Sequence, residues 1–134
     1  MTASVDWTAL ARAARTASGR AYCPYSRFAV GAAVLGDDGR VFTGCNVENA
    51  SFGLTVCAER NAIFHAIAEG ARRIVALALY TPTAEPATPC GACRQVLVEF
   101  GPDADVECRC DGRDVRRFTV SELLPHGFQL EGSG

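Results

Sequence analysis

Three cysteines placed at the starts of two predicted helices constrain this chain most strongly. Cys57 begins the run Cys-Ala-Glu-Arg, and Cys90 and Cys93 belong to the later run Pro-Cys-Gly-Ala-Cys-Arg. At a helix N-terminus, two side chains three residues apart lie on one face and can direct both sulfurs toward one point. Cys57 reaches the same point only if the two helix starts meet. A fold that suits this sequence must therefore bring two separate helix N-termini together.

The three thiols form a candidate catalytic zinc site. Zinc prefers four ligands, and a catalytic site keeps one of the four positions open for water. Exposed backbone N–H groups and the helix dipole favour thiolates at these positions. Glu59, two residues after Cys57, is placed to move a proton of that water. We expect Arg60 to donate hydrogen bonds to the sulfurs and offset their negative charge, with Arg94 as a second candidate for this role.

Other interpretations of these residues stay open. Cys90 and Cys93 alone could be a redox pair, although such a pair usually follows a thioredoxin-like first strand. A structural zinc site would need a fourth ligand, such as His65, His126 or another cysteine. Glu59 taken alone is an ordinary first-turn glutamate. We interpret both histidines as structural and assign core packing, which is common for free thiols, to the remaining cysteines, which are Cys23, Cys45, Cys108 and Cys110.

Length, charge and cysteine count limit the class of protein. The chain of 134 residues suits a single domain over residues 1–134. Seven cysteines, an odd number, favour metal or thiol chemistry in a reducing compartment over a disulfide framework. The net charge of −2 disfavours a nucleic acid polymer as a partner. The chain has no apolar run near the roughly 18 to 20 residues that cross a bilayer and no secretory signal at its start, so we expect a cytoplasmic protein without membrane association.

The order of the expected elements indicates an α/β protein with three α/β/α layers around a mixed sheet. Asp6 can cap the first helix and Gly19 can end it. An Asp-Gly turn joins two strands as a hairpin, and the almost wholly apolar run 73–80 is typical of a strand covered on both faces. The expected helices span residues 6–19, 57–69 and 90–100, with a last turn near 121–125, and the expected strands span residues 27–35, 40–47, 73–80, 106–110 and 116–120.

The sequence resembles the small, tetrameric cytidine deaminases of pyrimidine salvage from about Tyr22 to Phe128. The stretches that carry the resemblance are 23–33 (CPYSRFAVGAA), 44–50 (GCNVENA), 57–60 (CAER), 89–95 (PCGACRQ) and 122–125 (ELLP). The ligand-x-Glu and Pro-Cys-x-x-Cys pattern is that of zinc deaminases as a class. Here the first ligand is cysteine, as in the tetrameric branch, and not histidine.

The resemblance implies hydrolytic deamination of cytidine and deoxycytidine to uridine and deoxyuridine, with release of ammonia. Zn²⁺ on Cys57, Cys90 and Cys93 would activate water for attack at C4 of cytosine. Glu59 would pass protons to N3 and to the departing amino group. Backbone groups around Ala58 would stabilise the tetrahedral intermediate.

The resemblance also implies a nucleoside pocket and an assembly. Phe28 would flank the base or the ribose, and Asn46 and Glu48 would bind the ribose hydroxyl, although without the motif the last two are ordinary solvated loop residues. We expect a homotetramer with shared active sites, in which Phe128 closes a neighbouring subunit's pocket; the alternative is a hydrophobic lid on its own domain. Phe52 replaces a tyrosine that commonly reaches the neighbour's site in this family, which leaves that contact open.

Three further functions remain as alternatives. A blasticidin S deaminase would share the fold and act on a cytosine nucleoside antibiotic, whereas Asn46, Glu48 and Arg60 together favour cytidine. A polynucleotide editor would need a basic groove for the strand. A nonenzymatic zinc or thiol module would need a fourth protein ligand or a reversible Cys90–Cys93 disulfide. The sequence does not decide between ribose and deoxyribose.

Overall fold

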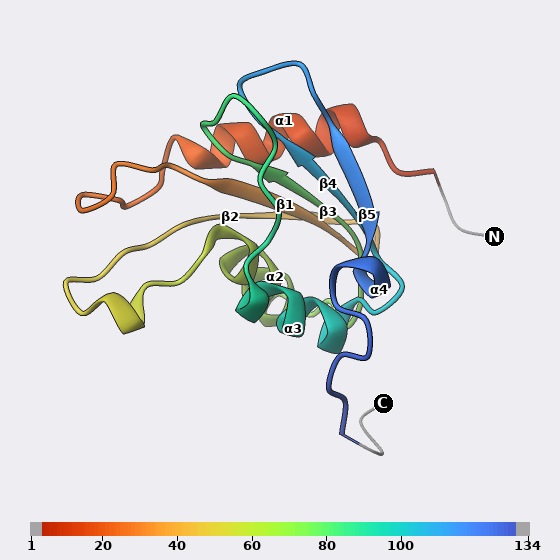
Figure 1. Cartoon of the computed structure of the whole chain (residues 1–134). Coiled ribbons are helices and arrows are strands. Elements are labelled where there is room, and N and C mark those ends of the chain that lie inside the picture. Colours follow the sequence, from red (N-terminus) through yellow and green to blue (C-terminus); the bar gives the residue numbers. More distant parts are fainter. Residues whose placement is uncertain (1–3, 131–134) are drawn as a thin grey trace.

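In the computed structural model, which describes residues 4–130, helices cover both faces of a five-stranded sheet (Figure 1). The strand order is β2-β1-β3-β4-β5, with β3 and β4 parallel and the other neighbouring pairs antiparallel. The strands are β1 (Gly31–Gly36), β2 (Val41–Cys45), β3 (Ile74–Tyr80), β4 (Asp105–Arg109) and β5 (Arg116–Thr119). The helices are α1 (Trp7–Ser18), α2 (Ala58–Ala68), α3 (Gly91–Phe100) and α4 (Val120–Leu123), with a 3-10 turn at Phe52–Leu54. The predicted α/β/α arrangement around a mixed sheet is confirmed.

Helix α1 alone covers one face of the sheet (Figure 1). Asp6 caps it as predicted, because its carboxylate accepts a hydrogen bond from the backbone N–H of Ala9 at 3.1 Å. The buried side chains Leu10 and Ala14 pack against alanines of β1 and β3. At Gly31 the two layers nearly touch, since a Cβ there would lie 1.8 Å from the carbonyl oxygen of Ala14. Small residues on both sides therefore set the short distance between α1 and the sheet.

Helices α2 and α3 cover the opposite face, where the larger part of the core lies. Ile63, Leu77, Leu97 and Val106 are fully buried there. Burial of each such side chain stabilises the fold by about 1.5–3 kcal/mol. None of the helices in the described part of the chain is both long enough and apolar enough to cross a bilayer.

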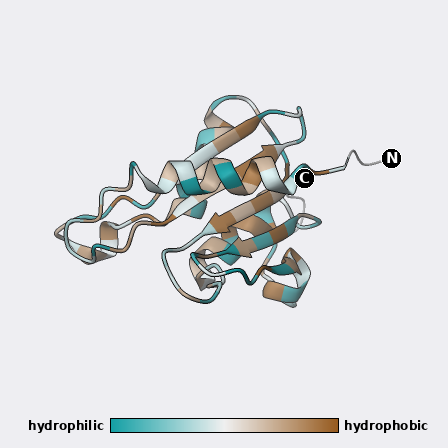
Figure 2. Ribbon diagram, turned by 90° about the horizontal axis from the view of Figure 1, so that it is seen from above, coloured by the Kyte–Doolittle hydropathy of each residue, from teal (hydrophilic) through white to brown (hydrophobic). Residues whose placement is uncertain are grey.

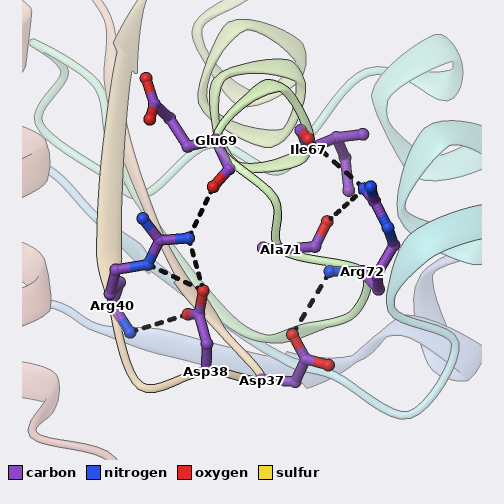
Figure 3. A network of polar contacts seen from close by, with 7 residues as sticks. All are labelled: Asp37, Asp38, Arg40, Ile67, Glu69, Ala71 and Arg72. Atoms are coloured by element: carbon purple, nitrogen blue, oxygen red, sulfur yellow. Dashed lines mark hydrogen bonds and ion pairs between the residues drawn. The ribbon is translucent and has the colours of Figure 1, made fainter.

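The hairpin between β1 and β2 is tied to the C-terminal end of α2 (Figure 3). Arg40 donates to the carboxylate of Asp38 and, at 2.7 Å, to the carbonyl oxygen of Glu69. The backbone N–H of Arg72 donates to the carboxylate of Asp37 at 3.3 Å. These contacts fix the C-terminal end of α2 against the hairpin.

The segment before β1 is irregular, although the sequence predicts a strand from residue 27. Arg27 has a φ of 60°, and its N–H donates to the carbonyl of Cys23 in a turn. The Asn46 side chain then donates to the carbonyl of Phe28 at 2.8 Å and accepts from the N–H of Val30 at 2.9 Å. Side chains satisfy most of this backbone, and the carbonyl of Val30 accepts from the backbone N–H of Asn46, so the regular strand β1 begins only at Gly31.

The segments 22–28 and 46–56 lie side by side and extend beyond the sheet, to the left in Figure 1 and Figure 2. The N–H of Tyr22 donates to the carbonyl of Asn46, and the N–H of Glu48 donates to the carbonyl of Tyr22. Several large apolar side chains of this arm are exposed, namely Tyr22, Tyr25, Phe28, Val47, Phe52 and Leu54. We refer to the two segments together as the arm.

Candidate active site

The starts of α2 and α3 meet and bring the three predicted thiols together. Cys57 and Cys90 are the N-cap residues of α2 and α3, and neither side chain caps its own helix. The Sγ of Cys90 lies 3.7 Å from that of Cys57 and 3.5 Å from that of Cys93, and all three sulfurs lie within 4.8 Å of one another. In a tetrahedral zinc site with Zn–S bonds of about 2.3 Å, neighbouring sulfurs stand about 3.8 Å apart. The spacing of these sulfurs fits zinc.

The group has three protein ligands and an open side. No fourth histidine, cysteine or carboxylate belongs to it within residues 4–130. Cys57 and Cys90 line a cavity of about 380 Å³, whereas Cys93 is fully buried. Three ligands beside a cavity are typical of a catalytic zinc site, because the fourth position faces water or substrate. The other four cysteines lie outside this group, and all seven are free thiols.

Arg60 lies where the sequence predicts it. Its Nη2 donates to the Sγ of Cys57 at 3.5 Å, while its Nε is buried without a hydrogen-bond partner among the described residues. The pKa of Cys57 falls to about 5, first because the Cys93 thiol donates to it and then because of Arg60. The pKa of Cys93 is raised by the same thiol–thiol bond and by burial. The first ligand therefore carries a thiolate, and a guanidinium lies beside it to offset charge.

Arg94 has a different place from the one expected. Its guanidinium donates to the carbonyls of Pro89 and Leu123 and to the hydroxyl of Thr88, with no hydrogen bond to a sulfur. The expectation that it supports the thiolates directly is therefore wrong. Its partner Leu123 could not be predicted from local sequence, because it lies 29 residues away in the chain.

Glu59 lies in the first turn of α2 and lines the cavity beside the cysteines. Only 5% of the residue is exposed, and this burial raises the pKa of its carboxyl group to about 7. A carboxyl group with such a pKa can accept and release a proton near neutral pH. Ala58, which precedes it, is fully buried and also lines the cavity.

The cavity collects residues from several segments at the ends of β2 and β3. It is lined by Ser26, Phe28, Val30, Asn46, Glu48, Thr55, Cys57, Ala58, Glu59, Leu79, Thr81, Ala87, Thr88 and Cys90. The predicted pocket residues Phe28, Asn46, Glu48 and Ala58 are all among them. Its volume and its mixture of apolar walls with a few polar groups suit a small molecule.

Glu48 is fixed by the turn at the edge of this cavity. Its carboxylate accepts hydrogen bonds from the N–H groups of Tyr25 and Ser26, at 3.0 and 3.2 Å, and from the Ser26 hydroxyl. These bonds, above all that of the hydroxyl, lower the pKa of Glu48. The Ser26 oxygen in turn accepts from the N–H of Phe28 at 3.0 Å. Sequence reasoning did not identify Ser26 as a site residue, and its only signal was its place in the stretch 23–33.

The two aromatic residues linked to assembly do not line this cavity. Phe128 has 67% of its surface exposed, and its carbonyl accepts from Nε2 of Gln95 at 2.8 Å. Phe52 is 75% exposed and packs edge-to-face on Tyr25, with ring centroids 6.1 Å apart. His65 lies outside the cysteine group, where its Nδ1 is 3.1 Å from the carbonyl of Thr43.

Comparison with known proteins gives the same picture. Residues 6–108 match the family model of the cytidine and deoxycytidylate deaminase zinc-binding region. The chain is 54% identical over 112 residues to a cytidine deaminase of Halalkalibacterium halodurans, across 83% of this chain and 85% of that one. It is 49% identical over 127 residues to a cytidine deaminase of Mycobacterium tuberculosis, across 95% and 92% of the two chains.

A solved structure extends the likeness to three dimensions. The crystal structure of cytidine deaminase from Burkholderia pseudomallei matches with a TM-score of 0.87 and 49% identity, over 96% of this chain and 100% of that one. The region matched by the zinc-binding family model contains Cys57, Glu59, Cys90 and Cys93. The resemblance inferred from the sequence is therefore confirmed: this chain belongs to the cytidine and deoxycytidylate deaminase family.

Proposed function

We propose that this protein is a zinc-dependent hydrolase that converts free cytidine and deoxycytidine to uridine and deoxyuridine with release of ammonia. The observation that carries the proposal is the convergence of three thiols and a buried carboxyl group on one small cavity. Relatives that share about half of the sequence and bear the name cytidine deaminase support it.

The residues of the site divide the chemistry among them. Cys57, Cys90 and Cys93 hold Zn²⁺, which when bound supplies Lewis-acid activation of water. Glu59 would take one proton from that water and deliver it to N3 of the base, and would then move a second proton, from the hydroxyl group added at C4, to the leaving amino group. Its place in the cavity beside the ligands suits both transfers. The first N–H groups of α2, beginning at Ala58, have no intrahelical partner and stabilise negative charge that develops near the site.

Other residues that line the cavity suit a nucleoside. Phe28 supplies an aromatic face against which a planar base or a ribose can pack. The amide of Asn46 uses one donor and one acceptor on the backbone of residues 28 and 30, which leaves one N–H and one lone pair for a ligand. Glu48 also lines the cavity, and its carboxylate can accept a hydrogen bond from a hydroxyl group of the sugar. We assign Asn46 and Glu48 to the sugar hydroxyls.

The charges of the cavity favour a nucleoside over a nucleotide. Glu48 and Glu59 are the charged side chains apart from the thiols, and no arginine is among the residues that line it. A phosphate in this cavity would lie near carboxylates, with no cationic side chain among the lining residues to pair with, and such like-charge contacts weaken binding by several kcal/mol.

The fall in ultraviolet absorbance as cytosine becomes uracil tests both the deaminase activity and the preference for nucleosides over nucleotides. Zinc-loaded protein should consume cytidine and deoxycytidine, while kcat/KM for CMP and dCMP should be lower by about a hundredfold or more, or about 2.7 kcal/mol. Equal turnover of CMP and cytidine would contradict the substrate assignment. Folded, zinc-loaded protein that leaves all four compounds unchanged would contradict the function.

We further propose that residues 1–134 form one domain, that the chain assembles as a homotetramer with shared active sites, and that it serves pyrimidine salvage in the cytoplasm. The exposed apolar side chains of the arm support an assembly, because such patches are typical of interaction surfaces. Phe128 is exposed and lies outside the cavity of its own chain, which suits a residue that closes the pocket of a neighbouring subunit.

A further inference from the structure

Arg94 directly follows the metal ligand Cys93 and connects three parts of the chain. Its Nε donates to the carbonyl of Pro89 at 2.7 Å, its Nη2 to the hydroxyl of Thr88 at 2.9 Å, and its Nη1 to the carbonyl of Leu123 at 2.8 Å. Each bond has a charged donor, and such bonds are stronger than those between neutral groups. One half-buried side chain thus joins the start of α3, the residues before it and the end of α4.

The hydrogen bonds from Arg94 to Pro89 and Thr88 hold a wall of the cavity. Thr88 lines the cavity together with Ala87, and the buried Pro89 directly precedes the ligand Cys90. Residues 86–89 make no backbone–backbone hydrogen bond within the described part of the chain. The position of this segment therefore depends on apolar contacts and on the two hydrogen bonds from Arg94.

The third contact holds the C-terminal part of the chain. Leu123 is the last residue of α4, where carbonyl groups lack intrahelical partners, and Arg94 supplies a donor to one of them. The next residue of α3, Gln95, donates to the carbonyl of Phe128 at 2.8 Å. Arg94 and Gln95 thus set the path of residues 123–128 along α3.

We propose that Arg94 is a positioning residue that holds the cavity wall at residues 86–89, and with it Cys90, in register with Cys93 and with the C-terminal segment. This proposal rests on the function proposed above. Lysine cannot replace arginine here, because one ammonium group does not reproduce the planar fork that reaches three acceptors. Loss of the fork should leave Cys90 and Thr88 less well fixed, so that zinc is released faster and nucleoside binds more weakly, with the proton transfer by Glu59 little changed.

The test compares Arg94→Met and Arg94→Lys with the matched control Arg72→Met. Arg72 also donates from its guanidinium to backbone carbonyls, those of Ile67 and Ala71 at 3.5 and 3.1 Å, but it lies at the far end of α2 and does not line the cavity (Figure 3). Zinc transfer to an excess of a chromogenic chelator is measured without substrate, and KM and kcat for cytidine are measured on zinc-loaded protein.

Both Arg94 variants should release zinc about tenfold faster than wild type or more, and raise KM about tenfold with a smaller change in kcat. Arg72→Met should match wild type in zinc release and KM. A purely structural role predicts that Arg94→Met only lowers the melting temperature, as expected for Arg72→Met, and leaves zinc release and KM unchanged; that result would overturn the proposal. If Arg94→Met does not fold, wild-type zinc release and KM in Arg94→Lys would overturn it. A wild type that is inactive toward cytidine contradicts the proposed function but leaves the comparison of zinc release valid.

Discussion

At the N-cap of α2 and of α3 stands a cysteine, where serine, threonine, aspartate or asparagine is usual. Neither Cys57 nor Cys90 makes a side-chain cap hydrogen bond, so each helix lacks about 1 kcal/mol of ordinary capping stability. Both sulfurs instead face each other across the two helix starts. Metal binding at this point couples to folding, because the ion joins two elements that are separate in sequence.

Substitution of single cysteines separates the ligands from thiols that only pack. Cys93→Ala should lower bound zinc well below one per chain, because two ligands remain. Cys108 is as fully buried as Cys93, but it lies outside the group, and burial raises its pKa to about 12. Cys108→Ala should therefore keep one zinc per chain and lose about 1 kcal/mol of stability. The zinc content of each variant is measured by metal analysis after gel filtration. Equal zinc content in the two variants would contradict the assigned ligand set.

Among the elements, the contact of α2 with β2 decides where the first ligand lies. A Cβ on Gly44 would lie 2.3 Å from the N of Ala62 and 2.7 Å from the carbonyl oxygen of Ala58, both of them backbone atoms of α2. Because these atoms cannot rotate away, Gly44→Ala must displace the helix that begins after Cys57. The variant should lose about 1–3 kcal/mol of stability and bind zinc less tightly.

The control for this change is Gly53→Ala in the arm, where a Cβ meets no atom within 4 Å. Thermal unfolding and zinc competition titrations on both variants measure the effect. If Gly44→Ala unfolds at the same temperature as Gly53→Ala and binds zinc equally well, then the close packing of α2 on β2 does not position the site.

Most helices and strands, and the residues of the cysteine site, could be predicted from local sequence. The starts of α2 and α3 coincide with Cys57 and Cys90, as the motifs indicate, and the apolar run at 74–80 is the central strand β3. Helix spacing predicted that Cys90 and Cys93 share one face, and the prediction that Cys57 joins them depended on the two helix starts meeting, as they do. These features follow from helix geometry and apolar patterning, which act over a few residues.

The remaining features depend on contacts between distant segments. The run 27–30 has the composition of a strand, but Asn46 takes its backbone groups and Arg27 turns the chain. Ser26 and Glu48 meet across the two segments of the arm, 22 residues apart. The bond from Arg94 to Leu123 spans 29 residues. No local periodicity reports such pairs, so the sequence did not predict these partners.

For the whole molecule, the exposed Phe128 lies outside the cavity of its own chain. Phe128→Ala should therefore lower activity in the homo-oligomer through the neighbour's pocket, although the residue does not line its own cavity. When Phe128→Ala and Glu59→Gln chains are co-expressed, some sites should combine an intact Glu59 with an intact Phe128 from the other chain. The mixed oligomer should then be more active than the average of the two pure variants, measured at equal zinc content.

Strict additivity in this mixing experiment would contradict a shared site. It would favour the alternative in which Phe128 serves only its own domain. Sedimentation of the wild-type protein gives the oligomeric state independently, and a monomer that is fully active would contradict the assembly itself.

The most direct test of the central claim follows ultraviolet absorbance as cytidine becomes uridine, with zinc-loaded wild type beside a Glu59→Gln variant that retains one zinc per chain. We expect steady turnover by the wild type and a loss of at least about a hundredfold in kcat for the variant, since a positioned acid and base typically contribute 10²–10⁴-fold. Turnover by Glu59→Gln at the wild-type rate would contradict the role of the buried carboxyl group. A folded, zinc-loaded wild type that leaves cytidine and deoxycytidine unchanged would contradict the deaminase account as a whole.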